Sequence, residues 1–346
     1  MDPLTHALSG ALVARALPVA RSPALTPREV FVAGAASAVF PDLDFVLRLV
    51  DTLTYLNHHA GITHSLLLWP AWSLLLAHGF AWLIRRHEAW RAFLPITAAG
   101  IGIHIAGDII TAYGVHLLAP FSARRYAGDI QFVVDGGLFL ILLAGVVLSL
   151  RWPRRHALPA AALALAALYV SGSALLKQQA LEIADTYAGS LKGTTLDRYV
   201  LPQPPSPFHW LLVVRTLDSV HSARVNLVAA RSRPRSADAS WWQRYESAFR
   251  PQGDLDWQRS PRADSPHAPS PAPEAWGTPA LEPLRHFMRF PVLDMIEAGR
   301  DLTCVRFVDL RFTLPEVTPS FRYGACRAST DSAWTLTRWR GDFYID

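Results

Sequence analysis

The chain has 346 residues, which is room for about two domains, and its composition is uneven along its length. It is 51% hydrophobic and 18% charged, and the apolar residues crowd into the N-terminal half. The net charge of +5 comes from basic residues in short loops between apolar stretches. Because a nucleic-acid protein would show a basic stripe with interleaved aromatics, we expect membrane lipids as partners and no nucleic acid.

Apolar segments dominate the first 180 residues. Asp2 followed by Pro3 predicts an N-cap with proline in the first helical turn, and the positive region of a cleaved signal peptide is missing. The last four segments approach the roughly 20 apolar residues that a spanning helix needs, whereas the first two are shorter or interrupted. We therefore predict an α-helical multi-pass membrane domain over residues 1–180. The segments cover residues 3–20, 28–50, 62–84, 92–118, 133–150 and 157–176.

Loop charge predicts an orientation in the membrane, because short loops rich in arginine stay in the cytoplasm. The loops at residues 21–28, 85–91 and 151–155 fall inside by this rule. The loops at 51–61 and 120–129, and the whole chain after Lys177, then fall outside. Arg124 and Arg125 break the rule and need another explanation.

The chain changes character after Lys177, where short segments become rich in β-branched and aromatic residues. They predict a small, mainly-β soluble domain over residues 190–346. In residues 305–312 polar residues recur every second or third position, as in a half-exposed strand. Residues 251–279 are dense in Pro, Ser and Ala and predict a disordered or extended excursion. The expected strands include residues 210–214, 223–229, 303–314 and 334–344.

The chain has two cysteines, Cys304 and Cys326, which excludes a thiolate zinc cluster. They leave open one disulfide, if this part of the chain faces an oxidising compartment, or two unpaired thiols.

Histidines and aspartates recur inside the apolar segments, where each ionisable group costs roughly 2.5–3.5 kcal/mol at a helix centre. A bound divalent cation would stabilise many of them at once. His104 and Asp108 are four residues apart and therefore share one helix face, although a His–Asp hydrogen bond between helices would explain the pair as well. The candidate metal ligands are His6, Asp42, Asp44, His59, His64, His104 and Asp108.

The other candidates stand at breaks in the apolar pattern. Asp42 and Asp44 follow a proline, where two carboxylates can converge on one ion, or where one can cap a helix. Three histidines surround Gly61, which permits a turn, and Thr63 is a candidate cap for the third helix. A pH-sensing or interfacial histidine cluster is the alternative there. His6 alone is equally explained by a place beside lipid headgroups. In the predicted orientation all these groups gather at the outer side.

Nitrogen and oxygen donors without sulfur favour zinc, manganese or iron, with zinc the commonest choice for hydrolysis. More than four ligands would allow two ions, an arrangement used for phosphoester cleavage. Arg124 and Arg125 could receive an anionic substrate group, or could anchor the loop at headgroups beside Tyr126. Asp135 is a further candidate ligand.

Motifs in a fixed order over residues 1–140 resemble the YdjM-like membrane-bound metal-dependent hydrolases, a bacterial and archaeal group. They are MDPLTHALSGALVARA, PDLD, HHAGITHSLL, HIAGDIITAYGVHLLAPFSARRY and VVDGG. The resemblance implies a multi-pass protein of the inner membrane, counted among the hydrolases mainly through its His/Asp pattern, and it marks the same seven ligands. One departure is Ala60, where the family has arginine. If that arginine binds substrate, the contact is lost here or comes from Arg124 or Arg125.

The motif order is similar, more distantly, to the N-terminal half of zinc-dependent phospholipase C and related zinc nucleases. Their later His-x-x-x-Glu pair has no match in this chain. This likeness implies a phosphoester, such as a lipid headgroup at the outer leaflet, as the substrate class. We predict a membrane-embedded hydrolase with catalytic His104 and Asp108, in which Arg124 and Arg125 hold the anion. The rival is a non-catalytic membrane protein with a metal in transport or in a structural role.

Overall fold

The computed structural model describes residues 1–191, 194–205, 207–234, 238–299, 301–328, 332–340 and 343–345. The chain divides into two compact units. Unit 1 comprises residues 1–175 and 204–207, and unit 2 comprises residues 176–203 and 208–346. The predicted fold class is confirmed, since unit 1 is helical and unit 2 carries antiparallel sheets.

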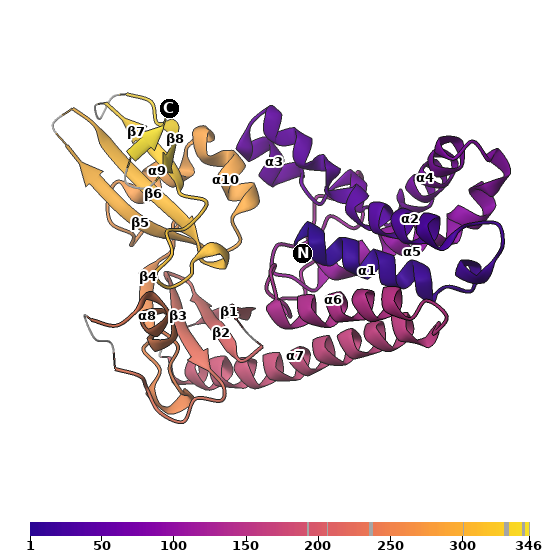
Figure 1. Ribbon diagram of the computed structural model, residues 1–346. Helices are drawn as coiled ribbons and strands as arrows, with labels where there is room; N and C mark the ends of the chain where they lie inside the picture. The colour runs from indigo at the N-terminus through magenta and orange to yellow at the C-terminus, as the bar shows by residue number, and fades with distance from the viewer. Residues whose placement is uncertain are drawn as a thin grey trace. The chain divides into compact units, whose positions relative to one another are not determined.

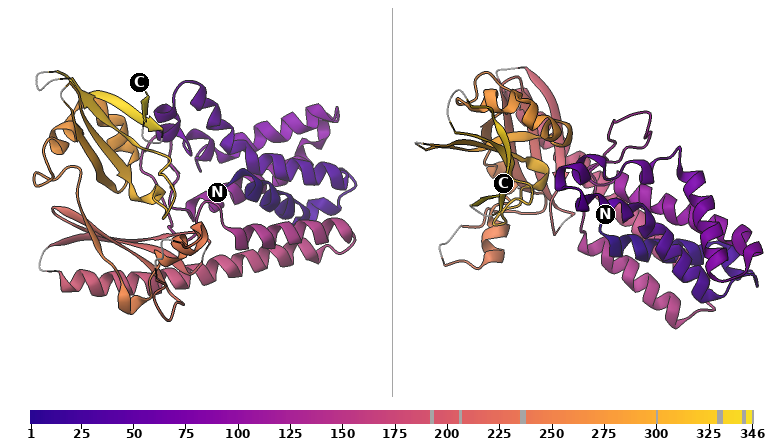
Figure 2. Two further views of the ribbon diagram at one scale, coloured as in Figure 1. Left: turned by 60° about the vertical axis from the view of Figure 1, so that its left-hand side comes forward. Right: turned by 90° about the horizontal axis from the view of Figure 1, so that it is seen from above.

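Unit 1 is built around α1 (Pro3–Ala16), α2 (Pro27–Val39) and α5 (Trp90–Ile109), which pack against one another (Figure 1). As predicted, Asp2 caps α1, accepting from the backbone of Leu4 and Thr5. Glycines bring α1 and α2 into close contact, because a Cβ atom built on Gly10 would lie 2.3 Å from the Cβ of Ala38. The two further views show these indigo and purple helices side by side (Figure 2).

Shorter elements connect and cover these three helices. α6 packs on α1, and an apolar cluster joins it to the first half of α7. These elements are η1 (Pro18–Arg21), η2 (Phe40–Leu49), α3 (Thr52–His58), η3 (Ile62–His64), α4 (Trp69–Leu83), η4 (His87–Ala89), α6 (Gly136–Arg151) and α7 (Ala157–Ser190).

Three helical stretches among the described residues are long and apolar enough to cross a membrane: Pro27–Leu49, His87–Ile109 and Ala157–Ser190. The second predicted segment, which was expected to be interrupted, is therefore long enough to span. Pro41 lies in the first turn of η2, where its missing N–H costs no helical hydrogen bond, so the apolar helix continues beyond the proline.

Other predicted spans differ from the structure. The third segment is part of a pair, Thr52–His64 and Trp69–Leu83, bent by 79° at the break between them. The fifth, α6, has only 16 residues. The fourth was predicted to reach residue 118 but ends at Ile109, because the chain beyond it pairs instead with a later loop, Thr111 with Gln131 and Val115 with Tyr126.

Unit 2 contains two antiparallel sheets, of order β1-β2-β3-β4 and β5-β6-β7-β8-β9. β2 is buried on both faces over its apolar residues, and one face packs on the second half of α7 through Ala180, Ala184 and Ala188. The strands are β1 (Thr195–Pro202), β2 (His209–Thr216), β3 (Ser219–Asn226), β4 (Gln258–Pro261), β5 (Pro291–Ala298), β6 (Thr303–Asp309), β7 (Tyr323–Arg327), β8 (Thr335–Arg340) and β9 (Phe343–Ile345). Short helices join them: α8 (Trp241–Ser247), η5 (Gln252–Asp254), α9 (Ala272–Gly277), η6 (Pro279–Leu281), α10 (Glu282–Phe287) and η7 (Leu310–Phe312).

Two predictions for unit 2 were wrong. Residues 251–279 are not one disordered or extended excursion, because β4 pairs with β3 and α9 buries Trp276 there. β6 is not half-exposed, since it is buried from Cys304 to Asp309. Its charged groups find partners inside, as Asp309 does with Arg311 at 2.7 Å. Cys304 and Cys326 face each other on β6 and β7 and form a disulfide, which decides between the two alternatives for them.

Candidate metal centre

A cluster of imidazoles and carboxylates lies among the helices of unit 1. His104 and Asp108 share one face of α5, Asp42 comes from η2, and His64 from η3. One nitrogen or oxygen of each lies within 4.8 Å of the others. His64 and His104 are fully buried, and Asp108 is 6% exposed. Three separate segments thus bring four potential ligands to one point.

The spacing of these four donor atoms fits a tetrahedral ion. Nε2 of His64 lies 2.8 Å from Nε2 of His104, and the two nitrogens lie 3.2 and 3.4 Å from Oδ2 of Asp108. Oδ1 of Asp42 is 3.9 and 3.8 Å from the same nitrogens. A tetrahedral zinc ion with bonds of about 2.0–2.1 Å has ligand–ligand edges of about 3.3 Å. The observed edges scatter around that value, so small side-chain movements would complete the geometry.

The orientation of His104 is set by the backbone of α2. Its Nδ1 lies 2.6 Å from the carbonyl oxygen of Ala38, which only an N–H can satisfy. In the neutral ring Nε2 therefore carries the lone pair, and that lone pair faces the cluster. Histidines that ligate metals typically donate their other ring N–H to a carbonyl or carboxylate in this way.

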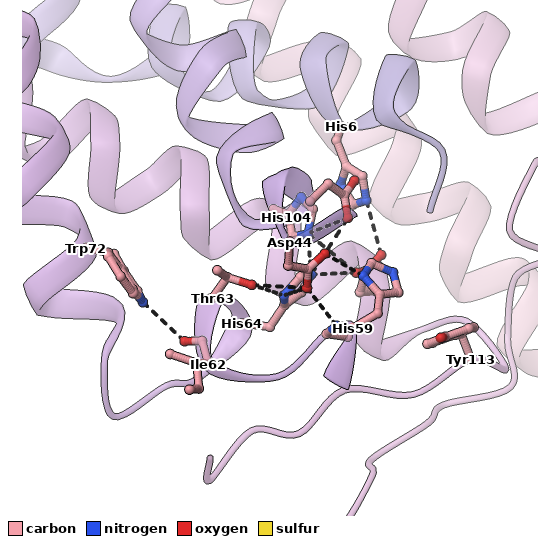
Figure 3. A network of polar contacts seen from close by, with 12 residues as sticks. His6, Asp44, His59, Ile62, Thr63, His64, Trp72, His104 and Tyr113 are labelled. Carbon is pink, nitrogen blue, oxygen red and sulfur yellow. Dashed lines mark hydrogen bonds and ion pairs between the residues drawn. The ribbon is translucent and has the colours of Figure 1, made fainter. Parts of the chain in front are cut away.

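The orientation of His64 is set by a relay through Thr63, which Figure 3 shows beside Asp44. The Thr63 hydroxyl lies 3.3 Å from Oδ2 of Asp44, which must accept, and 2.9 Å from Nδ1 of His64. When its single proton goes to the carboxylate, its oxygen accepts from Nδ1–H of His64. Nε2 of His64 then presents a lone pair, at the point that His104 also faces.

Asp44 and His59 form a pair next to the cluster. Nδ1 of His59 lies 2.7 Å from Oδ1 of Asp44, and the backbone N–H of Ala60 donates to Oδ2 over 3.0 Å. The ring of His59 stands edge-on to those of His64 and Tyr113, at centroid distances of 5.7 and 5.1 Å (Figure 3). Asp44 and His59 were predicted as ligands and both lie outside the group of four. Asp44 is hydrogen-bonded to His59, to the backbone of Ala60 and to Thr63.

His6 also lies outside the group of four. Its Nε2 is 3.1 Å from Oδ1 of Asp108, the oxygen that points away from His64 and His104, and its ring stacks on that of His104 at 3.8 Å. The amino group of Met1 contacts the same oxygen. His6 thus holds Asp108 with Oδ2 directed into the cluster. Its own Nδ1 is buried without a hydrogen-bond partner among the described residues.

The two arginines that were predicted to bind an anion both contact other groups of the protein. Arg125 donates from Nη2 to the carbonyls of Leu56 and Asn57, at 2.8 and 3.1 Å, and from Nη1 to that of Gly114 at 3.3 Å. Arg125 thus clamps the loop through these three carbonyls, and its role as the group that receives an anionic substrate stays a prediction. Burial, together with the charge of Arg125, also lowers the pKa of His116 in this loop to about 4. Arg124 is exposed and lies over the ring of Tyr126 at 5.1 Å, as in the alternative of an anchor.

Asp135, a further candidate ligand, is not one of the four residues whose donor atoms converge. It caps α6 by accepting from Leu138 and from the hydroxyl of Tyr169, at 2.8 and 2.9 Å.

Sequence reasoning missed the roles of Thr63 and of the Ala38 carbonyl. Thr63 was considered only as a helix cap, yet its place directly before His64 was a usable signal. The Ala38 carbonyl has no signal in the sequence, because every residue carries a backbone carbonyl.

Comparison with known proteins agrees with the helical half of this description. Residues 1–180 match the family described as the YdjM inner membrane protein. The protein YfhP of Bacillus subtilis (strain 168), which is described as uncharacterized, is 28% identical over 151 residues. That alignment covers 43% of this chain and 46% of the relative, so it spans about half the length of the curated protein. No solved structure matches significantly.

Proposed function

The chain belongs to the YdjM family of inner membrane proteins, and we propose that it is a membrane-embedded, metal-dependent hydrolase. Asp42, His64, His104 and Asp108 would hold the ion. The observation that carries the proposal is the convergence of their four donor atoms within 4.8 Å. Buried ionisable groups in apolar helices are expensive unless they have a partner of opposite charge, and a divalent cation is such a partner for both carboxylates.

Zinc fits this donor set best. The donors are two imidazole nitrogens and two carboxylate oxygens with near-tetrahedral edges, and no sulfur is present to favour copper(I). A bound zinc ion would act as a Lewis acid and would lower the pKa of a contacting water to about 7. This needs a coordination position that the protein leaves open, and Asp42, which lies 3.8 and 3.9 Å from the two histidines, is the ligand best placed to give way to water.

The surrounding residues prepare the cluster for this chemistry. The carbonyl of Ala38 and the hydroxyl of Thr63 fix the two imidazoles, and His6 fixes Asp108. We assign proton transfer to His59, because Asp44 on Nδ1 leaves Nε2 as the nitrogen that can take a proton from a reacting water. The side chain of His59 is 15% exposed, whereas those of His64 and His104 are fully buried.

The favoured substrate is a phosphoester, such as a lipid headgroup, and it rests on the distant likeness of the motif order to zinc-dependent phospholipases. Loop charge supports a site at the outer leaflet. The disulfide between Cys304 and Cys326 supports an extracytoplasmic place for unit 2, because disulfides persist in oxidising compartments.

The test is metal content by mass spectrometry together with hydrolysis of phosphatidylglycerol in nanodiscs and of a soluble phosphodiester. We expect close to one zinc per chain in the wild type, and loss of both metal and hydrolysis in His104→Ala and Asp108→Ala. His78→Ala is the matched control, because His78 is an exposed histidine of α4. His59→Asn should retain the metal, and its rate of hydrolysis should fall by about 100-fold or more.

Three results would contradict the proposal. Wild-type protein that binds no metal, or variants that keep full metal content, would show that the cluster is a hydrogen-bonded network. Stoichiometric metal without turnover of either substrate, but with ion flux in liposomes, would favour the rival role in transport.

A further inference from the structure

Unit 2 has a cavity of about 540 Å³ that lies outside the metal centre. One wall is the part of β3 that follows Ser222, where β4 no longer pairs with it, because β4 pairs only with Ser219–Ser222. Arg250 replaces β4 along the next residues, donating its N–H to the carbonyl of Arg224 over 3.1 Å. The other walls come from the end of α8 and the turn at Glu316. Among the lining residues are Ser222, Arg224, Arg233, Ser247, Arg250 and Glu316.

Arg224 projects from β3 towards the cavity. Its neighbour Val225 faces the apolar cluster on α7, and alternate residues of a strand face opposite sides of the sheet. The Nε atom of Arg224 is buried and has no hydrogen-bond partner among the described residues. Burial also lowers the pKa of its guanidinium below the ordinary value.

The other charges of the cavity wall are paired. Arg233 lies 3.3 Å from Glu246, and Arg250 lies 3.6 Å from Asp254. Glu316 is held by Arg244 at 2.9 Å. Asp256, the remaining acidic residue of the lining, is exposed. Arg224 therefore stands out as a largely buried cation for which no acidic partner lies within ion-pair distance in the described part of unit 2.

A guanidinium presents Nε–H and one Nη–H in parallel along one edge, and this edge matches two oxygens of a phosphate or carboxylate group. A cavity of about 540 Å³ lies within the range of small-molecule sites. We propose that this cavity binds a small oxyanion, a phosphate group being the best match, through the side chain of Arg224. Arg233 and Arg250 add positive potential at its border. The phosphate could arrive as a free anion or as part of a lipid headgroup.

The experiment uses the full chain in detergent after removal of metal with a chelator, so that the metal centre does not contribute. Binding of inorganic phosphate is measured by calorimetry against chloride of the same ionic strength. We expect Arg224→Gln to weaken binding by about tenfold or more, and Arg224→Lys to keep the charge but recover only part of the affinity. Arg259→Gln is the control, since Arg259 is exposed on β4 of the same sheet.

Equal phosphate affinity in wild type and Arg224→Gln would overturn the proposal, as would wild-type binding no stronger than that of chloride. Intact disulfide and unchanged protease resistance of the Arg224→Lys protein show that unit 2 is folded. If phosphate binding depends on Arg224, competition with lipid nanodiscs identifies whether the phosphate group comes from a lipid headgroup or from a free anion. Displacement of phosphate by phosphatidylglycerol but not by phosphatidylcholine assigns the site to lipid headgroups, and no displacement assigns it to free anions.

Discussion

Each buried imidazole of the metal centre has one nitrogen tied to a neighbour and one directed inwards. For His104 the neighbour is a main-chain carbonyl, and for His64 it is a hydroxyl that connects to Asp44. Such partners fix the tautomer and the ring plane before a cation binds, and their loss typically costs 10–100-fold in metal affinity. We therefore expect the metal affinity of the site to depend on residues outside the group of four potential ligands as well.

Thr63→Val tests this at the residue scale. Valine has nearly the same shape but breaks the relay to Asp44, so we expect zinc affinity to fall by about 10–100-fold without complete loss. Competition with a chelating dye measures the affinity. Thr186→Val is the control, because the Thr186 hydroxyl donates to its own helix at an exposed position. Unchanged affinity in Thr63→Val would mean that the hydroxyl does not orient His64.

Arg125 and Arg124 form a natural matched pair. Arg125→Ala removes a donor from three carbonyl oxygens, of which that of Leu56 keeps the Tyr113 hydroxyl as another donor, so we expect a loss of about 1–3 kcal/mol in the free energy of unfolding. Arg124→Ala removes an exposed side chain and should change stability by no more than about 0.5 kcal/mol. Thermal unfolding in detergent gives both values. Equal stability of the two variants, with lost hydrolysis in Arg125→Ala alone, would instead support its predicted role as a substrate-binding group.

At the scale of elements, the close approach of α1 and α2 positions the site, because α2 runs directly into the segment that carries Asp42. The approach depends on small residues. A Cβ atom on Gly10 would meet the carbonyl oxygen of Gly34 at 2.4 Å as well as Ala38, whereas one on Gly79 meets nothing within 4 Å. Small residues commonly allow such contacts between membrane helices.

Gly10→Ala should therefore separate the two helices and lower the free energy of unfolding by about 1–3 kcal/mol, with weaker zinc binding as a consequence. Gly79→Ala makes the same chemical change in an open part of α4 and should stabilise the protein by about 0.5–1 kcal/mol through helix propensity. Thermal unfolding and metal titration of both variants check this. A Gly10→Ala protein as stable as Gly79→Ala would show that the helices can relax at no cost.

The first sheet of unit 2 has a pH-sensitive contact between β2 and α8. Burial lowers the pKa of His209 below its ordinary value of 6.5, although Glu246, 3.4 Å away, acts in the opposite direction. The neutral ring accepts from Asn226, 3.2 Å from Nε2. A histidine whose pKa falls on folding leaves stability intact above pH 6.5 and reduces it as the pH drops below that value.

Below pH 6.5 we expect the free energy of unfolding of unit 2 to fall by up to about 1.4 kcal/mol per pH unit. In His209→Gln we expect a smaller fall. Pulse proteolysis of the full chain, followed with a C-terminal tag, measures this. His267→Gln is the control, because the side chain of His267 is 75% exposed. A pH profile of His209→Gln that parallels the wild type would assign the sensitivity to other groups.

At the scale of the whole molecule, the central question is which side of the membrane each part faces. Loop charge and the disulfide of unit 2 support the same orientation independently of each other. A cysteine introduced by Arg259→Cys, at an exposed position of unit 2, should be labelled in intact spheroplasts by a membrane-impermeant maleimide, which does not reach the buried and bonded Cys304 and Cys326. In a variant where serine replaces both, a cysteine introduced by His87→Cys should stay unlabelled until the membrane is opened. Labelling of His87→Cys in intact spheroplasts would invert the orientation.

The amino-acid sequence by itself indicated a membrane protein, and it marked the four residues that converge in unit 1 together with three that do not join them. Apolar segments predict membrane helices wherever they occur, and the cost of ionisable groups inside them marks His64, His104 and Asp108 without knowledge of the fold. His104 and Asp108 were predictable even as a pair, since helical periodicity fixes their relation.

Only the tertiary structure decided what each group does. The division into Asp42, His64, His104 and Asp108 facing one another, and His6, Asp44, His59 and Thr63 supporting them, depends on contacts between segments up to 102 residues apart. The same holds for Arg125, which binds carbonyls, and for Arg224, whose buried Nε finds no hydrogen-bond partner among the described residues. Local patterns specify which face of a helix or strand a residue occupies, but not which segment will pack against that face.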